Sequence, residues 1–366
     1  MHLYIHVPFC ARRCSYCDFA IAVRRTVPSS RYLEAIALEW ALWETHPAWD
    51  ASPDVDTIYF GGGTPSRLDS AAIARLIELI AARRTLRPGA EITLEANPDD
   101  VTPTAALQWA SAGVNRISLG VQSFDASVLA WMHRTHRVEQ VQPAIEALRN
   151  AGIANISLDL IFGLPPALGR NWERDLERAF GLDPSHLSLY GLTIEPHTPL
   201  SRWTDRGEVT TVPDEGYAAE FLHTAAVLRA LGWDHYELSN AARPGFRSVH
   251  NAAYWRRASY IGLGPSAHSG FGGERQWNIR DWAAYDRALR EGAAPRLGGE
   301  TLTAEAARLE ALYLGLRTSD GAPAELIPHS IATAWTCAGW GTETAGRFRL
   351  SAEGWLRLDA LVAQAA

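Results

Sequence analysis

The feature that most constrains the fold is a regular alternation of short β-rich runs with helix-length amphipathic stretches over the first two-thirds of the chain. Such alternation is typical of βα units whose strands form a parallel sheet. The pattern predicts strands at residues 3–7, 57–60, 91–95, 116–120, 156–161 and 186–190. Helices are predicted at residues 31–43, 70–83, 104–112, 138–151 and 172–180, with Ser70 and Thr104 as helix caps. Six such units are too few for an eight-stranded barrel, so an α/β fold is expected, as either an open sheet or an incomplete barrel.

The last third has a different character. A proline-containing segment after Thr193 leads to a predicted helix at 213–231 and then to a glycine-rich stretch at 260–273. Beyond it, the pattern predicts a helix at 303–316, a strand at 347–350 and a capped helix at 351–362. We therefore expect this part to be mostly helical, with two short strands near its end and a domain boundary between Thr193 and Glu300.

Composition excludes several classes of function. Hydrophobic residues make up 47% of the 366 residues, which is enough for a substantial core. The formal net charge of −7 provides no electrostatic footprint for nucleic acid or anionic lipid, and no long arginine or lysine run marks a basic patch. The chain has neither an apolar run of about eighteen residues nor a cleavable signal segment. We expect a cytoplasmic protein that does not bind nucleic acid.

Three of the four cysteines lie within eight residues, as Cys10-x-x-x-Cys14-x-x-Cys17, directly after the first predicted strand. Three thiolates at this spacing can hold three irons of a [4Fe–4S] cluster and leave the fourth iron open to a ligand. A zinc site completed by His6 or Asp18 is the alternative, although no second CxxC pair is present. The spacing favours the cluster, and the distant Cys337 is expected to be a buried thiol.

The segment YIHVPFCARRCSYCDF resembles the opening of radical S-adenosylmethionine (SAM) proteins. The glycine turn GGGTPS, which follows the second predicted strand, supports this resemblance. The later segments LEANPDD, SLGVQSF, MHRTH and SLDLIFGLP resemble, in order, motifs of the coproporphyrinogen dehydrogenase-like subfamily. The resemblance implies SAM contacts by Tyr4, Gly62, Gly63, Thr64, Glu95, Gln122, Arg134 and Asp159.

The same resemblance implies an architecture. It is an incomplete (β/α)6 TIM-like barrel, the radical SAM core, with a smaller and mostly helical, winged-helix-like C-terminal domain. On this basis we expect the core at 1–235, a connecting region with an HNxxYW motif at 236–300 and the C-terminal domain at 301–366.

Three features point to one branch of the subfamily. Phe19 stands where the dehydrogenases have a further cysteine, the motifs begin close to Met1, and the segment HNAAYW starts at His250. That segment resembles the HNxxYW signature of HemW-type heme chaperones. The resemblance implies that His250 is a heme ligand, with His268 as a second candidate. On residue types alone, a His250 that forms hydrogen bonds inside a domain interface is the competing interpretation.

The expected function is therefore heme binding and delivery by a protein that carries a SAM-binding [4Fe–4S] cluster. The implied partners are heme, recipient hemoproteins, a flavodoxin or ferredoxin-type reductant and a second copy of the chain, with peripheral attachment to a membrane during delivery. A radical SAM coproporphyrinogen III dehydrogenase, which decarboxylates propionate side chains, is the enzymatic alternative. A zinc-loop binding protein without redox chemistry is the third.

Overall fold

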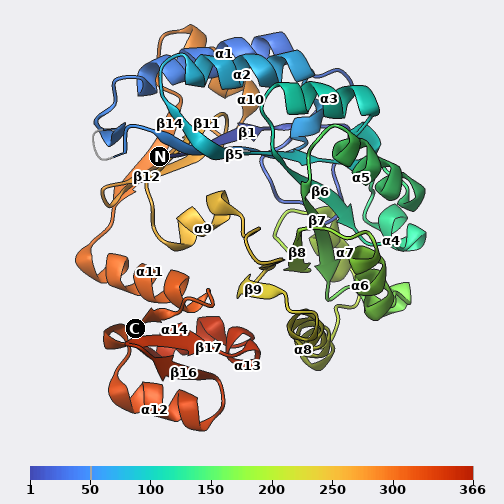
Figure 1. Ribbon diagram of the computed structural model, residues 1–366, viewed down its shortest axis with the longest axis vertical. Coiled ribbons are helices and arrows are strands. Elements are labelled where there is room, and N and C mark those ends of the chain that lie inside the picture. The colour runs from blue at the N-terminus through green and yellow to red at the C-terminus, as the bar shows by residue number, and fades with distance from the viewer. Residues whose placement is uncertain (50–51, 366) are drawn as a thin grey trace.

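The computed structural model describes residues 1–49 and 52–365. A twelve-stranded mixed sheet forms the centre of the molecule (Figure 1). In sheet order its strands are β14 (Arg296–Thr301), β13 (Glu274–Asn278), β12 (His268–Phe271), β11 (Tyr260–Leu263), β1 (His2–Val7), β4 (Val55–Gly62), β5 (Leu86–Ala96), β6 (Arg116–Gln122), β7 (Asn155–Phe162), β8 (His186–Gly191), β10 (Asn240–Ala242) and β9 (Asp234–Glu237). The strands from β11 to β8 in this order are parallel, and those beyond them on either side pair antiparallel.

The six predicted strands are the central ones, and the predicted helices follow them in the expected order. The helices of this part are α1 (Ser29–Trp43), α2 (Ser70–Ala81), α3 (Pro103–Ser111), α4 (Ala126–Trp131), α5 (Val141–Asn150), α6 (Trp172–Gly181), α7 (Pro199–Asp205) and α8 (Asp214–Ala230). The two predicted N-caps are wrong. Asp69 occupies the N-cap of α2, and the Thr102 hydroxyl caps α3 by accepting from the N–H of Ala105 at 3.1 Å. In α3 the start shifts because Pro103 takes the first helical position, where its missing N–H costs nothing.

Each central strand has one apolar face and one polar face. Leu3, Ile5 and Val7 of β1 are fully buried in the main hydrophobic core. The alternate residues of the same strand point to the opposite face of the sheet. Of these, Tyr4 and His6 contact each other there, with the Tyr4 hydroxyl 3.2 Å from His6 Nδ1. This inner face carries the polar residues that the predicted site requires.

The expectation of a mostly helical last third is wrong for residues 234–301. Here β9 to β14 extend the central sheet on both sides, and only α9 (Val249–Trp255) and α10 (Trp282–Arg290) are helical. The antiparallel strands β11 and β12 lie in the glycine-rich stretch, whose composition does not show the usual strand pattern. A Cβ at Gly262 would lie only 2.1 Å from the carbonyl oxygen of His268, so close strand approach requires glycine there.

The C-terminal elements gather at one end of the molecule, away from α1 and α2 (Figure 1). They are α11 (Ala304–Leu316), β15 (Ala322–Pro323), α12 (His329–Cys337), β16 (Gly341–Thr344), β17 (Arg347–Leu350), α13 (Ala352–Trp355) and α14 (Leu358–Ala365), and the strands form a separate sheet in the order β15-β17-β16. The predicted continuous helix at 351–362 is divided in two, since the Trp355 indole donates to the Leu316 carbonyl at 3.0 Å and fixes the chain where it turns. Among the described residues, no helix combines the length and apolar character needed to cross a bilayer.

Candidate functional site

The cysteine loop is tied to its surroundings through its backbone. Two short parallel strands, β2 (Phe9–Cys10) and β3 (Ala22–Val23), close the loop at its base. Within it, the Ser15 N–H donates to the Met132 carbonyl at 3.2 Å, and the Ser15 carbonyl accepts from the N–H of Leu200 at 2.9 Å. Because distant segments fix its backbone, the loop presents its thiols from a defined position.

Ten of the twelve predicted site residues line one cavity of about 370 Å³ at the carboxyl ends of the central strands. They are Cys10, Cys14, Cys17, Gly62, Gly63, Thr64, Glu95, Gln122, Arg134 and Asp159. These residues come from β2, the cysteine loop, the strands β4 to β7 with the turn after β4, and the segment after α4, so the fold joins parts that are far apart in the sequence. This edge of a parallel sheet is where α/β proteins place their ligands.

The thiols meet polar groups that can stabilise thiolates. The Thr64 hydroxyl donates to Cys10 Sγ at 3.5 Å, and the Arg134 guanidinium donates to Cys14 Sγ at 3.7 Å. Burial raises the pKa of Cys10 and raises that of Cys17 to about 11, so both thiols are protonated until a metal displaces the protons. No three His, Cys, Asp or Glu side chains of the described residues form a site for a single metal ion. Three cysteines around one cavity are nevertheless the donor set that three irons of a [4Fe–4S] cluster take.

The glycines of the turn after β4 lie too close to neighbouring residues to be replaced by residues with a side chain. Gly62 has φ +111°, and a Cβ there would lie 2.5 Å from the His6 ring. A Cβ on Gly63 would lie 2.8 Å from the carbonyl of Pro8. The Gly62 N–H donates to a Glu95 carboxylate oxygen at 3.0 Å, which links the turn to the next strand. The turn can therefore approach a ligand closely because it carries no side chain.

Two carboxylates form part of the cavity wall. Burial raises the pKa of Glu95 to about 7, although Glu95 also accepts from the Tyr59 hydroxyl at 2.8 Å. Burial also raises the pKa of Asp159, whose two oxygens accept from the Ser118 hydroxyl at 2.8 and 3.0 Å. Tyr59 and Ser118 line the cavity but were not among the predicted residues. Their signal was the alternation along the strands, which places both on the inner face.

Arg134 and Gln122 also line the cavity, and both lie close to Gly120 of β6. Arg134 donates to the Asn97 side-chain oxygen at 2.5 Å and to the Gly120 carbonyl at 2.9 Å. Its Nε is buried without a protein partner among the described residues, so one donor is available to a ligand. Gln122 has φ 66° and lies beyond a β-bulge that interrupts the pairing of β6 with β7. Such bulges redirect side chains next to functional sites.

Tyr4 and His250 do not line this cavity. His250 is 1% exposed, and both ring nitrogens are engaged, Nδ1 with Thr57 Oγ1 at 2.6 Å and Nε2 with the Tyr254 hydroxyl at 2.9 Å. Its ring stacks on Tyr59 with the centroids 4.9 Å apart, and the Tyr4 ring also stacks on Tyr59, with its centroid 6.4 Å from that of His250. Heme ligation by His250 stays a prediction, since it requires these hydrogen bonds to break.

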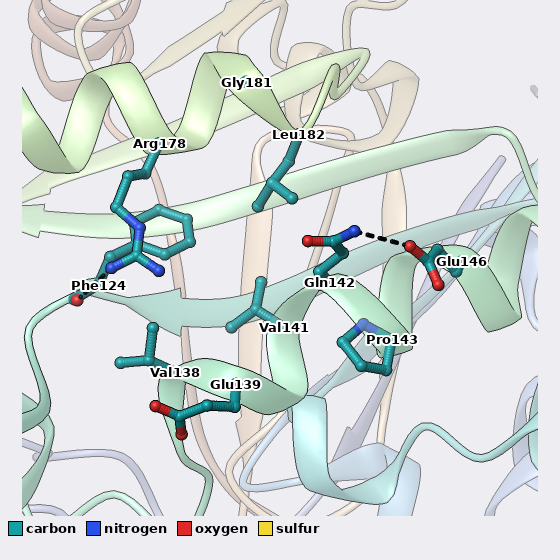
Figure 2. A pocket seen from close by; sticks show the side chains of 10 residues that line it. All are labelled: Phe124, Val138, Glu139, Val141, Gln142, Pro143, Glu146, Arg178, Gly181 and Leu182. Carbon is teal, nitrogen blue, oxygen red and sulfur yellow. Dashed lines mark hydrogen bonds between the residues drawn. The ribbon is translucent and has the colours of Figure 1, made fainter.

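His268 and Cys337 are exposed, although Cys337 was expected to be buried. A second cavity of about 370 Å³ lies between α5 and α6 (Figure 2). There the Arg178 guanidinium covers the Phe124 ring, and Gln142 donates to Glu146 at 2.8 Å. None of the predicted site residues lines it.

Comparison with known proteins identifies the family of the chain. Residues 4–179 match the model of the radical SAM superfamily. The chain is 35% identical over 321 residues to "Heme chaperone HemW" of Bacillus subtilis strain 168, which covers 87% of this chain and 83% of that protein. It is 37% identical over 270 residues to the protein of the same name from Escherichia coli K12, covering 73% and 69% of the two chains.

A solved structure shares the whole fold. The coproporphyrinogen III oxidase HemN from Escherichia coli, described as a radical SAM enzyme, matches with a TM-score of 0.81 and 22% identity, covering 99% of this chain and 89% of that one. At this identity the match concerns the fold alone. The length and identity of the sequence matches go further, and they show that this chain belongs to the HemW family within the radical SAM superfamily.

Proposed function

We propose that this protein is a heme chaperone that binds heme and delivers it to recipient hemoproteins. The observation that carries the proposal is the 35% identity to a protein named heme chaperone HemW over 87% of the chain. The HNAAYW segment on α9 adds support, because it resembles the HNxxYW signature of this family. Cytoplasmic localisation and assembly of two copies are part of the same proposal.

We further propose that Cys10, Cys14 and Cys17 hold a [4Fe–4S] cluster and that SAM binds beside it. The cluster supplies an open iron that can bind a ligand and exchange one electron. Arg134 can pair with the SAM carboxylate through its free Nε, and the carboxylates of Glu95 and Asp159 can accept from N–H and hydroxyl groups. Thr64 and Arg134 would stabilise the thiolates by donating to them.

The finer architecture belongs to this proposal too. We interpret the parallel strands β1 and β4 to β8 as an incomplete (β/α)6 barrel, because their polar inner faces surround one cavity. The order of helices and strands from α11 to α14 is compatible with a winged-helix-like domain. The proposed division remains 1–235 for the core, 236–300 for the connecting region and 301–366 for the C-terminal domain.

His250 is the proposed heme ligand. Because Thr57 and Tyr254 engage both of its nitrogens, ligation requires α9 to move or the ring to rotate away from these partners. Burial lowers the pKa of His250 well below its usual range, so the imidazole is neutral, which is the form that binds iron. A chaperone needs adjustable ligation, and a histidine that exchanges protein partners for iron provides it.

The test is anaerobic reconstitution with iron and sulfide, followed by heme titration monitored by visible absorption. Wild type, His250→Ala and His268→Ala are compared. We expect one heme per chain in wild type and His268→Ala, and weakened uptake in His250→Ala. Stoichiometric heme uptake by wild type and by both variants would refute His250 as the ligand. Absence of heme uptake by wild type would refute the chaperone function.

The second candidate is coproporphyrinogen III dehydrogenase activity. The shared fold with HemN and the cavity lined by all three cysteines keep it open. Conversion of coproporphyrinogen III to protoporphyrinogen IX by the anaerobic protein with SAM and a reductant would establish it. A colourless preparation with about one zinc per chain would instead favour the zinc-loop alternative.

A further inference from the structure

Helix α9, which carries His250, is attached to the central sheet through its first backbone N–H groups. The Glu91 carboxylate on β5 accepts from the N–H of Val249 at 3.0 Å through one oxygen and from the N–H of His250 at 3.0 Å through the other. Val249 and His250 are the first two residues of the helix, where N–H groups have no partner within the helix itself. One carboxylate, 158 positions away from Val249 in the chain, therefore caps α9.

Two paired residues of β4 and β5 hold both the side chain and the backbone of His250. Glu91 pairs with Thr57 across these strands, and the Thr57 hydroxyl oxygen lies 2.6 Å from Nδ1 of His250. Helix α9 has only seven residues, which are too few to be stable without contacts to the rest of the protein. The position of His250 therefore depends on these contacts, of which the hydrogen bonds to the Glu91 carboxylate are charge-assisted.

Arg116 offers the Glu91 carboxylate a second partner. It lies on the neighbouring strand β6 and is 1% exposed, and its Nε is 4.0 Å from the Glu91 oxygen that accepts from Val249. This distance is too long for a hydrogen bond, and within the described chain Nε and one terminal nitrogen of Arg116 have no hydrogen-bond partner. A buried carboxylate needs partners. If α9 moves away, Glu91 can bind the free donors of Arg116 instead of being left unpaired.

We propose that Glu91 is a positioning residue that controls the release of His250 for heme. We call its two hydrogen bonds to the N–H groups of Val249 and His250 the latch. The inference rests on the proposed function, because it concerns the same heme ligand. With the latch closed, Thr57 and Tyr254 engage both nitrogens of His250. With the latch open, Glu91 pairs with Arg116, α9 can leave the sheet, and the imidazole becomes available to iron.

A latch affects heme binding in a way that a purely structural contact does not. When only the open fraction of the molecules binds heme, the apparent affinity is reduced in proportion to that fraction. A substitution that weakens the latch raises the open fraction, so the protein should become less stable and yet bind heme faster and more tightly. Loss of a contact that only stabilises the fold would slow heme binding or leave it unchanged.

Two substitutions weaken the latch from its two sides. Glu91→Gln keeps the shape of the side chain but removes the charge and one of the two acceptor oxygens. Val249→Pro removes one donor and leaves the carboxylate and Arg116 in the chain. Proline is favoured at the first position of a helix, and Ser248 before it has the extended backbone that a following proline requires. The Val249 side chain is 43% exposed, so its replacement leaves no buried cavity.

Each substitution has a matched control. Val249→Ala changes the same side chain but keeps the backbone N–H. Glu39→Gln removes the charge of another buried carboxylate, which lies on α1. The Glu39 carboxylate accepts from the Gly264 N–H at 2.7 Å and from the side chains of Asn278 and Tyr285, none of which belongs to α9. This control therefore separates the latch from a general loss of stability.

The test uses the full-length protein after reconstitution with iron and sulfide. Amide hydrogen exchange over residues 248–256, measured by mass spectrometry without heme, reports the opening of α9. Stopped-flow absorption with free heme gives the association rate, and a heme titration gives the apparent affinity. The double variant Glu91→Gln/His250→Ala shows whether a gain in association depends on His250.

We expect faster exchange in α9 and heme association at least about tenfold faster in Glu91→Gln and Val249→Pro, because hydrogen bonds to a charged group are lost. Both controls should stay within twofold of wild type, and the gain should disappear in the double variant. If Glu91→Gln fails to fold, Val249→Pro alone decides the outcome.

Several results would overturn the inference while leaving the proposed function intact. They are unchanged or slower heme association in the latch variants, unchanged exchange in α9, the same acceleration in Glu39→Gln, and a gain that persists without His250. Absence of heme uptake by wild type would instead refute the proposed function, and the inference with it.

Discussion

The Oγ1 atom of Thr57 lies 2.6 Å from Nδ1 of His250, although 193 positions separate the two residues in the chain. The His250 ring stacks on Tyr59, and the Tyr59 hydroxyl donates to Glu95 at the cavity. The HNxxYW segment on α9 therefore contacts Tyr59, the same side chain that donates to Glu95 at the cavity. A change at His250 can reach the proposed SAM site through a single side chain.

The first prediction concerns this hydrogen bond. Thr57→Val keeps the shape of the buried side chain but leaves Nδ1 of His250 without its partner. We expect the free energy of unfolding to fall by about 1–3 kcal/mol, measured by urea denaturation. If heme ligation requires His250 to leave this position, heme association should become faster, as measured by stopped-flow absorption.

Thr93→Val is the matched control for this substitution. Thr93 is also fully buried, and it pairs with Tyr59 in the neighbouring strand, but its hydroxyl has no hydrogen-bond partner among the described residues. Its replacement should leave both stability and heme association near the wild-type values. A slower association in Thr57→Val would argue that the histidine binds heme without leaving Thr57.

The parts of the fold and of the site that could be predicted are those marked by short sequence motifs or by strand periodicity. Cys10, Cys14 and Cys17, the glycine turn and the strand ends were all located from the sequence, because parallel βα units place the ends of their strands at one edge. The orientation of His250 could not be derived, because it depends on Thr57, which reaches it from β4, whereas Tyr254 lies one turn away on the same helix. The strands β11 to β14 were missed because their glycines reflect close backbone contacts that no local pattern reveals.

The second prediction tests the proposed cluster ligands. Cys17→Ala removes one of three thiolates, so we expect reconstituted iron to fall from about four atoms per chain to near zero, with loss of the visible absorption. Cys337→Ala is the control, because Cys337 is exposed on α12 and lines none of the described cavities with the other cysteines. Full iron content in Cys17→Ala, or its loss in Cys337→Ala, would contradict the assignment.

The third prediction concerns pH. With a pKa of about 7, Glu95 is protonated below that pH and is then a weaker acceptor for the N–H and hydroxyl groups of SAM. SAM affinity should therefore rise with pH, by up to about tenfold per unit below pH 7, and level off above it. Isothermal titration at pH 5.5 to 8 measures this dependence.

The Glu95→Gln variant provides the control for the pH effect. Its amide does not titrate, so its SAM affinity should be weaker than that of wild type above pH 7 and should vary little with pH. The same slope in both proteins would assign the pH dependence to another group, with Asp159 the next to test, since burial raises its pKa as well.

The last prediction separates ligand binding from backbone strain at Gln122. This residue has φ 66°, a left-handed conformation that costs a non-glycine residue about 1–2 kcal/mol. Gln122→Gly relieves this strain, so we expect stability to stay equal or to rise by as much as about 1 kcal/mol in thermal unfolding. SAM affinity should fall about tenfold, because the side chain that lines the cavity is gone. Ala345→Gly relieves similar strain at φ 54° in the exposed turn between β16 and β17, and it should change stability alone. Undiminished SAM affinity in Gln122→Gly would show that the strained backbone at the end of β6 shapes the cavity without a contact from the Gln122 side chain.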